Sequence, residues 1–148
     1  MHLNDSITRN KKFLCHFLHH EQSLSMAAEG YFRTNNKIAL INVTTGPGAI
    51  NALNGVFGAF VDSIPMLIIS GQVKTDTMLS NSQKNINLRQ LGDQEVDLFN
   101  FVKPIVKYVA TPTNTLDTLL ALKNCLFYLN YHRPGPVSYT HLTLPTKA

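Results

Sequence analysis

The 148-residue chain has no tryptophan, two cysteines and no apolar run long enough to span a bilayer. Cys15 and Cys125 stand far apart in apolar stretches, which favours buried free thiols in a reducing compartment over a disulfide. Because Met1 begins a polar segment, we also expect no secretory signal peptide. These absences predict a cytoplasmic protein without a membrane partner.

Charged residues are also scarce, at 15% of the chain, and the formal net charge is only +4. The one small basic cluster, Arg9, Lys11 and Lys12, has no aromatic side chains around it that could stack on bases, so we expect no nucleic-acid partner. The six histidines share no metal-ligand spacing and predict no metal site. Hydrophobic residues make up 44%, which fits one folded domain with a real core.

Two apolar runs, 37–43 and 65–71, have the composition of strands that are covered on both faces of a parallel sheet. The small-residue spacing of 49–60 predicts a helix between them, so 37–71 should form a right-handed βαβ unit. The polar segment 72–93 is expected to be a long loop, functional or disordered. Further strands are predicted over 13–18, 105–109 and after Arg133–Val137, and further helices over 3–10, 21–33, 96–101 and from Asn114 onward. The last helix should present an apolar face of Leu116, Leu119, Leu120, Lys123 and Phe127.

Glu21 stands between the apolar run 13–18 and the start of the helix predicted over 21–33. Ligands of α/β proteins usually sit at the carboxyl ends of strands, so this carboxylate is placed where it can face a bound molecule. From the residues alone, the alternative is that Glu21 merely favours the positive amino end of the helix.

Residues 44–48, Thr-Thr-Gly-Pro-Gly, end one predicted strand and precede a helix. Flexible backbone at a helix start lets amides approach a ligand closely. However, Asn51 stands where a dinucleotide-binding pattern needs a third glycine, and the lysine of a phosphate-binding loop is missing. On these residues alone, a binding turn and a tight turn without a ligand are both open.

Several short motifs follow one another between His19 and Val137. They are His20-Glu21-Gln22, residues 27–31, residues 44–48, Asn51, residues 62–65, residues 71–73, Gln94-Glu95, Lys103-Pro104 and residues 133–137. As a set they resemble the N-terminal, pyrimidine-binding domain of thiamine-diphosphate-dependent enzymes, acetolactate synthases and similar enzymes in particular. The resemblance implies an α/β domain of three layers, with a central parallel sheet flanked by helices. This thiamine-diphosphate-binding fold would be incomplete here, because the strand expected before Asn4 is missing.

The resemblance implies a catalytic role for Glu21, as the carboxyl that hydrogen-bonds the ring nitrogen of the cofactor's aminopyrimidine. That bond favours the imino tautomer, whose nitrogen can take the proton from the thiazolium carbon. To share a proton near neutral pH the carboxyl needs a raised pKa, which we expect from a dry, apolar site. The other positions that the resemblance assigns are Thr45, Gly46, Pro47 and Asn51 for cofactor binding and Gln94 as a second catalytic residue near the reacting centre.

Other positions depart from the family. Asp93 stands where many acetolactate synthases have an aromatic residue that shapes the substrate pocket, which leaves the keto acid and its acceptor open. The family binds the diphosphate through Mg²⁺ in a separate C-terminal domain with a Gly-Asp-Gly motif, which this chain does not contain, so we assign no metal ligand here. Some relatives also bind FAD, for which this sequence offers no support. We assign residues 1–137 to an N-terminally truncated pyrimidine-binding domain, and 138–148 to a non-native tail resembling a cloning junction.

Three functions follow as hypotheses. In the first, the chain is a fragment of a transferase or lyase that decarboxylates or carboligates 2-keto acids with thiamine diphosphate and Mg²⁺, as a homodimer or higher homo-oligomer with its site between subunits. The isolated fragment should then bind cofactor weakly, turn nothing over and be poorly soluble through its apolar dimer-facing surface. In the second, it is a catalytically silent binding or interaction module that retains the fold. In the third, it is a nucleotide-binding α/β domain that does not respond to thiamine diphosphate.

Overall fold

Four parallel strands form a single sheet in the order β1-β2-β4-β3 in this computed structural model, which describes residues 2–81 and 87–143. The strands are β1 (Ala39–Val43), β2 (Met66–Lys74), β3 (Tyr108–Ala110) and β4 (Val137–Thr143). Ala39 pairs with Met66, and Val137 pairs with both Leu67 and Tyr108. The α/β fold class predicted from the sequence is confirmed.

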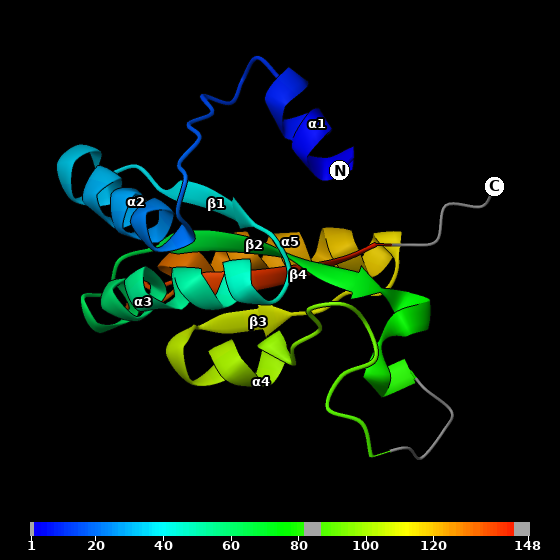
Figure 1. The fold of residues 1–148 in the computed structure, drawn as a ribbon. Helices are drawn as coiled ribbons and strands as arrows, with labels where there is room; N and C mark the ends of the chain where they lie inside the picture. The colour runs from blue at the N-terminus through cyan, green and yellow to red at the C-terminus, as the bar shows by residue number, and fades with distance from the viewer. Residues whose placement is uncertain (1, 82–86, 144–148) are drawn as a thin grey trace.

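Helices cover both faces of the sheet (Figure 1). The helices α2 (Glu21–Asn35), α3 (Pro47–Val61) and α4 (Leu98–Val102) bury one core against β1 and β2, with Ala52, Val56 and Ile68 at its centre. The helix α5 (Thr115–Asn130) buries a second core on the other face, with Cys125, Leu129 and Tyr139. Within the described ranges, no helix is both long and apolar enough to cross a membrane.

The remaining helices are short. The helix α1 (His2–Arg9) contacts β1 through a hydrogen bond from Asn42 Nδ2 to Asn4 Oδ1 at 2.6 Å. Single 3₁₀ turns, η1 (Thr75–Thr77) and η2 (Leu79–Asn81), follow β2, and η3 (Lys103–Ile105) follows α4. The polar segment after β2 therefore contains local turns rather than a long helix or strand within its described residues.

The helix boundaries follow from local chemistry. His20 caps α2 by accepting the Gln22 N–H at its Nδ1 atom, at 3.3 Å. Pro47 occupies the first turn of α3, where its missing N–H costs nothing. Asn114 caps α5, as predicted, by accepting the Asp117 N–H at 2.9 Å.

The prediction of a strand over 13–18 is wrong. This segment has no assigned strand, and Phe13, Leu14 and Phe17 are 53%, 83% and 82% exposed. The sheet's outer strand on this side is β1, which pairs only with β2. An apolar run needs a hydrogen-bonded neighbour to become a strand, and among the described residues none lies beside this one.

The predicted apolar face of α5 is also wrong. Leu116, Leu120 and Phe127 are 79%, 58% and 55% exposed, whereas the buried face of this helix carries Ala121, Cys125 and Leu129. The helix is apolar on several sides, so spacing alone does not select the side that faces the sheet.

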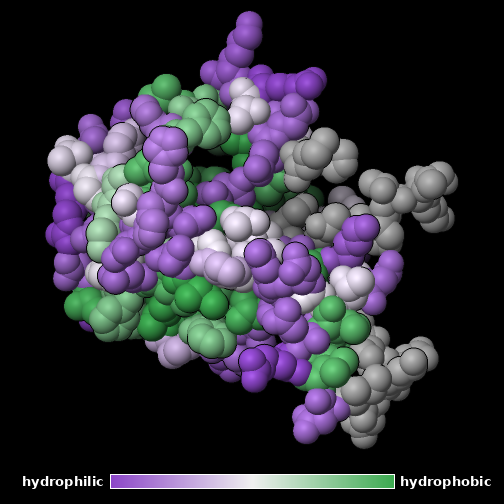
Figure 2. Space-filling view, viewed as in Figure 1, coloured by the Kyte–Doolittle hydropathy of each residue, from purple (hydrophilic) through white to green (hydrophobic). Residues whose placement is uncertain are grey.

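The segment excluded as a non-native tail contributes to the fold, because β4 runs through it and Ser138, Tyr139 and Thr140 are buried. The origin of 138–148 stays a prediction. Apolar side chains are exposed elsewhere too: Figure 2 shows them gathered over α3 and α4, where Phe57 and Phe101 are 54% and 56% exposed.

Candidate functional site

The carboxyl ends of β1 and β2 bring together four segments that are distant in the sequence: the start of α2, the turn after β1, the start of α3 and the segment 91–97. This end of a parallel sheet is where α/β folds usually hold ligands. The sequence-predicted residues Glu21, Thr45, Gly46, Pro47, Asn51 and Gln94 all lie in these segments.

Glu21 is the first residue of α2, and its carboxylate faces the glycine turn and α3. Asn51 Nδ2 donates a hydrogen bond to Glu21 Oε2 at 3.2 Å. A Cβ atom added at Gly48 would lie 3.2 Å from Glu21 Oε1, so the missing side chain lets the carboxylate pack closely against the start of α3. Glu21 also stands at the positive amino end of α2. Its position is therefore compatible both with facing a ligand and with merely stabilising the helix.

The Glu21 carboxyl has a lowered pKa, which is the opposite of the direction expected from a dry site. The main cause is a hydrogen bond from its own backbone N–H, followed by the bond from Asn51, and His20 adds a favourable charge. Burial raises the pKa but is outweighed, because this chain leaves the carboxylate in contact with solvent. The prediction of a raised pKa is therefore wrong for this chain as the structure describes it.

The glycine turn is tightly constrained by its own backbone. Gly46 has φ +57°, and a Cβ atom there would lie only 2.2 Å from the carbonyl oxygen of Gln94. A Cβ atom at Gly48 would lie 2.6 Å from Thr44 Cγ2. Packing thus explains both glycines without a ligand, while it also places Gln94 directly against the turn.

Gln72, at the carboxyl end of β2, links the turn to the segment after it. Thr45 Oγ1 donates to Gln72 Oε1 at 3.1 Å, and Gln72 Nε2 donates to the Val96 carbonyl at 3.1 Å. The sequence does not single out Gln72 as a site residue, although it lies in the motif 71–73. The signal that could have found it is an amide at the end of a buried strand.

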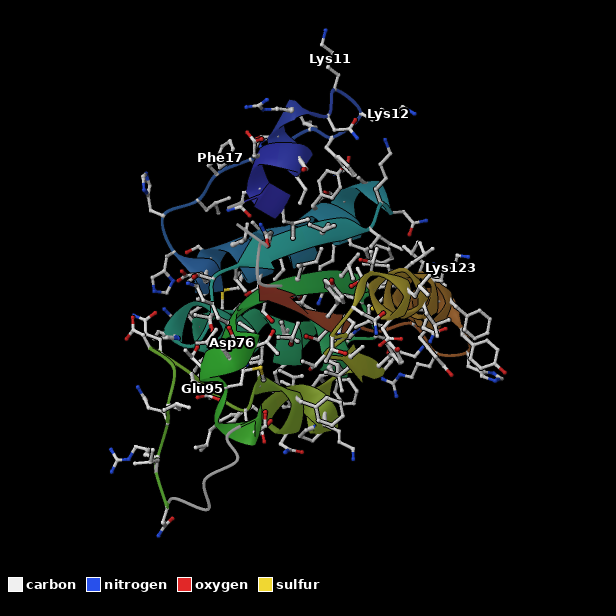
Figure 3. All side chains as sticks on the ribbon, turned by 90° about the vertical axis from the view of Figure 1, so that its right-hand side faces the viewer. Lys11, Lys12, Phe17, Asp76, Glu95 and Lys123 are labelled. Atoms are coloured by element: carbon white, nitrogen blue, oxygen red, sulfur yellow. The ribbon has the colours of Figure 1, made fainter. Side chains whose placement is uncertain are left out.

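Glu95 is a second carboxylate at this edge to which the sequence assigns no role. It accepts three backbone N–H groups: Leu79 at 2.7 Å, and Leu91 and Gly92 at 3.0 Å each. Burial is the largest single influence and raises the pKa of Glu95, but the three donors together lower it below its ordinary value. Figure 3 views the molecule from this side, with Glu95 and Asp76 beside the end of β2.

A groove of about 770 Å³ lies next to Glu95. Its walls include Gln72 from the turn network, Phe99 and Phe101 from α4, and the exposed Arg89. The described part of the chain brings no three histidine, cysteine, aspartate or glutamate side chains into an arrangement that could hold a metal ion.

The sequence matches a known family model. The model described as "Thiamine pyrophosphate enzyme, N-terminal TPP binding domain" covers residues 1–97. The acetolactate synthase large subunits of Buchnera aphidicola (from Schizaphis graminum) and Haemophilus influenzae are 37% and 36% identical to this chain, each over 118 residues. The large subunit of acetolactate synthase isozyme 3 of Escherichia coli is 34% identical over the same length. Each alignment covers 80% of this chain and 19% of the relative, so the chain spans about a fifth of the relatives' length.

Proposed function

Because this chain belongs to the thiamine pyrophosphate enzyme family, in its N-terminal TPP-binding domain, we propose that it supplies the aminopyrimidine-binding half of a thiamine diphosphate site. The observation that carries the proposal is the Glu21 carboxylate, which is held by Asn51, packs beside Gly48 and stays in contact with solvent. A carboxyl so placed can reach the ring nitrogen of a heterocycle inserted between the starts of α2 and α3.

In this proposal Glu21 moves a proton at that ring nitrogen. Bound thiamine diphosphate would supply a nucleophilic thiazolium carbon and store the electrons left by decarboxylation. Asn51 keeps the Glu21 carboxylate aimed at the turn through its Nδ2 donor. Covering the carboxyl removes water and raises its pKa from the low value of the open chain, so that the group can share a proton near neutral pH.

The remaining residues define the shape of this half-site. Gly46 and Pro47 set the backbone at the start of α3, and Thr45 is held by Gln72. Gln94, which packs against Gly46, is the residue that we place nearest the reacting centre. The diphosphate and its Mg²⁺ would be held outside this chain, and FAD has no residues assigned to it here.

We propose that the protein carrying this chain decarboxylates or carboligates a 2-keto acid, as an acetolactate synthase-like transferase or lyase. The site of such an enzyme would lie between two subunits of a homodimer or larger homo-oligomer in the cytoplasm. The alternative is a catalytically silent module that has kept the fold. The arrangement of Glu21, Asn51 and Gly48 favours the enzyme, because it holds a solvent-accessible carboxylate beside the glycine turn, which a silent module does not need.

Substitution of Glu21 by Gln in the enzyme that carries this chain tests the proposal. Glu21→Gln keeps the shape and removes the exchangeable carboxyl proton, so turnover of 2-keto acid should fall by roughly 10²- to 10⁴-fold. Glu29→Gln is the matched control, since Glu29 lies on the same helix but bonds Arg33 instead. If both variants turn over substrate at the wild-type rate, Glu21 has no catalytic role and the silent module is favoured.

A further inference from the structure

Glu95 gathers three backbone donors on one carboxylate. Leu79 reaches Oε1 of this carboxylate, whereas Leu91 and Gly92 share Oε2. The donors lie at the start of η2 and in the segment just before Glu95, so a single side chain joins two stretches that are twelve or more positions apart. Hydrogen bonds to an ionised acceptor are stronger than neutral ones, which suits this role.

The residue before Glu95 is held in an unusual conformation against the glycine turn. Gln94 has φ +58°, and its carbonyl oxygen approaches Gly46 so closely that a Cβ atom there would lie 2.2 Å away. Residues other than glycine rarely adopt such a conformation, so surrounding contacts must impose it. The residue that follows Gln94 is Glu95, whose carboxylate accepts the three backbone hydrogen bonds.

A second connection joins the other side of Glu95 to the same turn. Val96 accepts a hydrogen bond from Gln72 Nε2, and Gln72 Oε1 accepts one from Thr45 Oγ1. Gly92, which is also bound to Glu95, lies so near β2 that a Cβ atom there would be 2.8 Å from Val73. The Glu95 segment is therefore fixed to β2 and to the turn at several points.

We propose that Glu95 is a positioning residue, whose carboxylate clamps Leu79 to residues 91–92 and thereby presses Gln94 against Gly46 at the start of α3. Because Asn51 lies on α3, this contact fixes the position of Asn51, and the hydrogen bond from Asn51 then orients the Glu21 carboxylate. The inference rests on the proposed function only in treating Glu21 as the working carboxyl of this turn. Asp97, two residues further along the chain, takes a different role: its carboxylate caps α4 by accepting the Asn100 N–H at 3.2 Å.

The test compares Glu95→Gln with wild type in the 148-residue chain by NMR, without any cofactor. Loss of bonds to an ionised acceptor should speed hydrogen exchange at the amides of Leu91 and Gly92 by at least about tenfold. The amide signals of Thr45, Gly46 and Gly48 should also move. The carboxyl titration of Glu21 should shift upward, toward its ordinary pKa, because Asn51 no longer holds it firmly.

Two further variants make the result decisive. Asp97→Asn removes a neighbouring carboxylate and should leave the turn signals and the Glu21 titration unchanged. Glu95→Asp keeps the charge with a shorter reach and should give intermediate shifts, so the clamp can be assessed even if Glu95→Gln does not fold. The proposal is overturned if exchange rises at Leu91 and Gly92 while the turn signals and the Glu21 titration stay as in wild type. Because no cofactor is added, that outcome is independent of whether thiamine diphosphate binds.

Discussion

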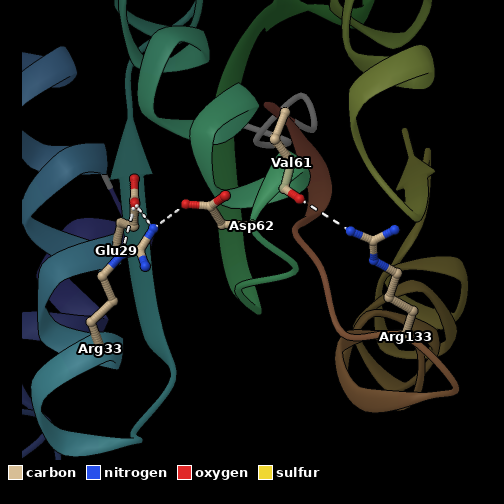
Figure 4. Close-up of polar contacts among 5 residues, drawn as sticks. All are labelled: Glu29, Arg33, Val61, Asp62 and Arg133. Carbon is tan, nitrogen blue, oxygen red and sulfur yellow. Dashed lines mark hydrogen bonds and ion pairs between the residues drawn. The ribbon is translucent and has the colours of Figure 1, made fainter.

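The two ends of the parallel sheet use charge in different ways. At the amino ends of the strands, Arg33 donates to Glu29 and Asp62, and Arg133 donates to the Val61 carbonyl at 3.1 Å (Figure 4). Lys107 similarly donates to the Tyr128 and Tyr131 carbonyls near the end of α5, at 2.6 and 2.5 Å. These cations stand at helix carboxyl ends, where positive charge is stabilising.

At the carboxyl ends of the strands, the charged groups in the hydrogen-bond networks are the carboxylates of Glu21 and Glu95. Glu21 and Glu95 accept amide and backbone donors rather than pairing with lysine or arginine. Both have lowered pKa values and lie beside backbone that only glycine or a constrained residue adopts. The comparison teaches that cations stabilise helix carboxyl ends at one edge of the sheet, whereas at the other edge amide and backbone donors hold carboxylates in place.

The largest effect on stability should follow from Gly46→Ala, which changes the glycine turn at the carboxyl ends of the strands. Its φ of +57° and the 2.2 Å approach of Gln94 both oppose a side chain. We expect a loss of about 1–3 kcal/mol in unfolding free energy, measured by urea denaturation, because the backbone must leave this region or strain it. Gly30→Ala is the control: nothing lies within 4 Å of its added Cβ in α2, so stability should rise by about 0.5–1 kcal/mol. Equal stability of the two variants would refute the tight turn.

A smaller effect should appear as pH dependence. The pKa of Glu95 in the folded chain lies below its ordinary value of 4.5, so the unfolded chain binds more protons near that pH. Glu95 therefore stabilises the fold above pH 4.5, and this contribution is lost as the pH falls through the lower, folded value. Glu95→Gln should flatten the acid side of a plot of melting temperature against pH. Arg133→Gln, at the opposite end, changes no carboxyl group and should leave that acid slope in place; flattening by both variants would contradict the assignment.

The smallest effect should come from Asp62→Asn, at the amino end. The variant removes one partner of Arg33 but leaves Glu29, and the pair is exposed, so screening by salt should already weaken it. We expect a slight fall in melting temperature at low salt that disappears at high salt. A large fall that persists in high salt would show that this end is more strongly coupled than the geometry suggests.

Much of the fold is predictable from the sequence because its signals are local. The strands β1 and β2 lie in apolar runs, and Asn114 and the glycine turn mark helix starts by their own chemistry. The expected burial on both faces is wrong for β1, where Leu40 is 37% exposed. The segment 13–18 has an equally strong apolar signal, but strand formation depends on a pairing partner that composition does not reveal. The buried side of α5 is decided by the small residues Ala121 and Cys125, which fit closely against the sheet.

The candidate site is only partly predictable for a related reason. Glu21 and the glycine turn stand out by motif, and the structure brings them together. The contributions of Gln72 and Glu95 depend in part on bonds to distant residues, from Gln72 to the Val96 carbonyl and from the Leu79 N–H to Glu95, and the sequence does not identify these partners. The pKa of Glu21 also lies on the opposite side of its ordinary value from the prediction, because the local sequence does not identify the residues that would bury it.

The most direct test of the account is the carboxyl titration of Glu21 by NMR in the enzyme that carries this chain, with and without saturating thiamine diphosphate. Without cofactor the midpoint should lie below the ordinary value of 4.5, as the hydrogen bonds of the open site require. With cofactor bound it should rise toward neutrality as the heterocycle displaces water and shares the proton. A midpoint that stays below 4.5 with the cofactor in place would contradict the proton-sharing role of Glu21.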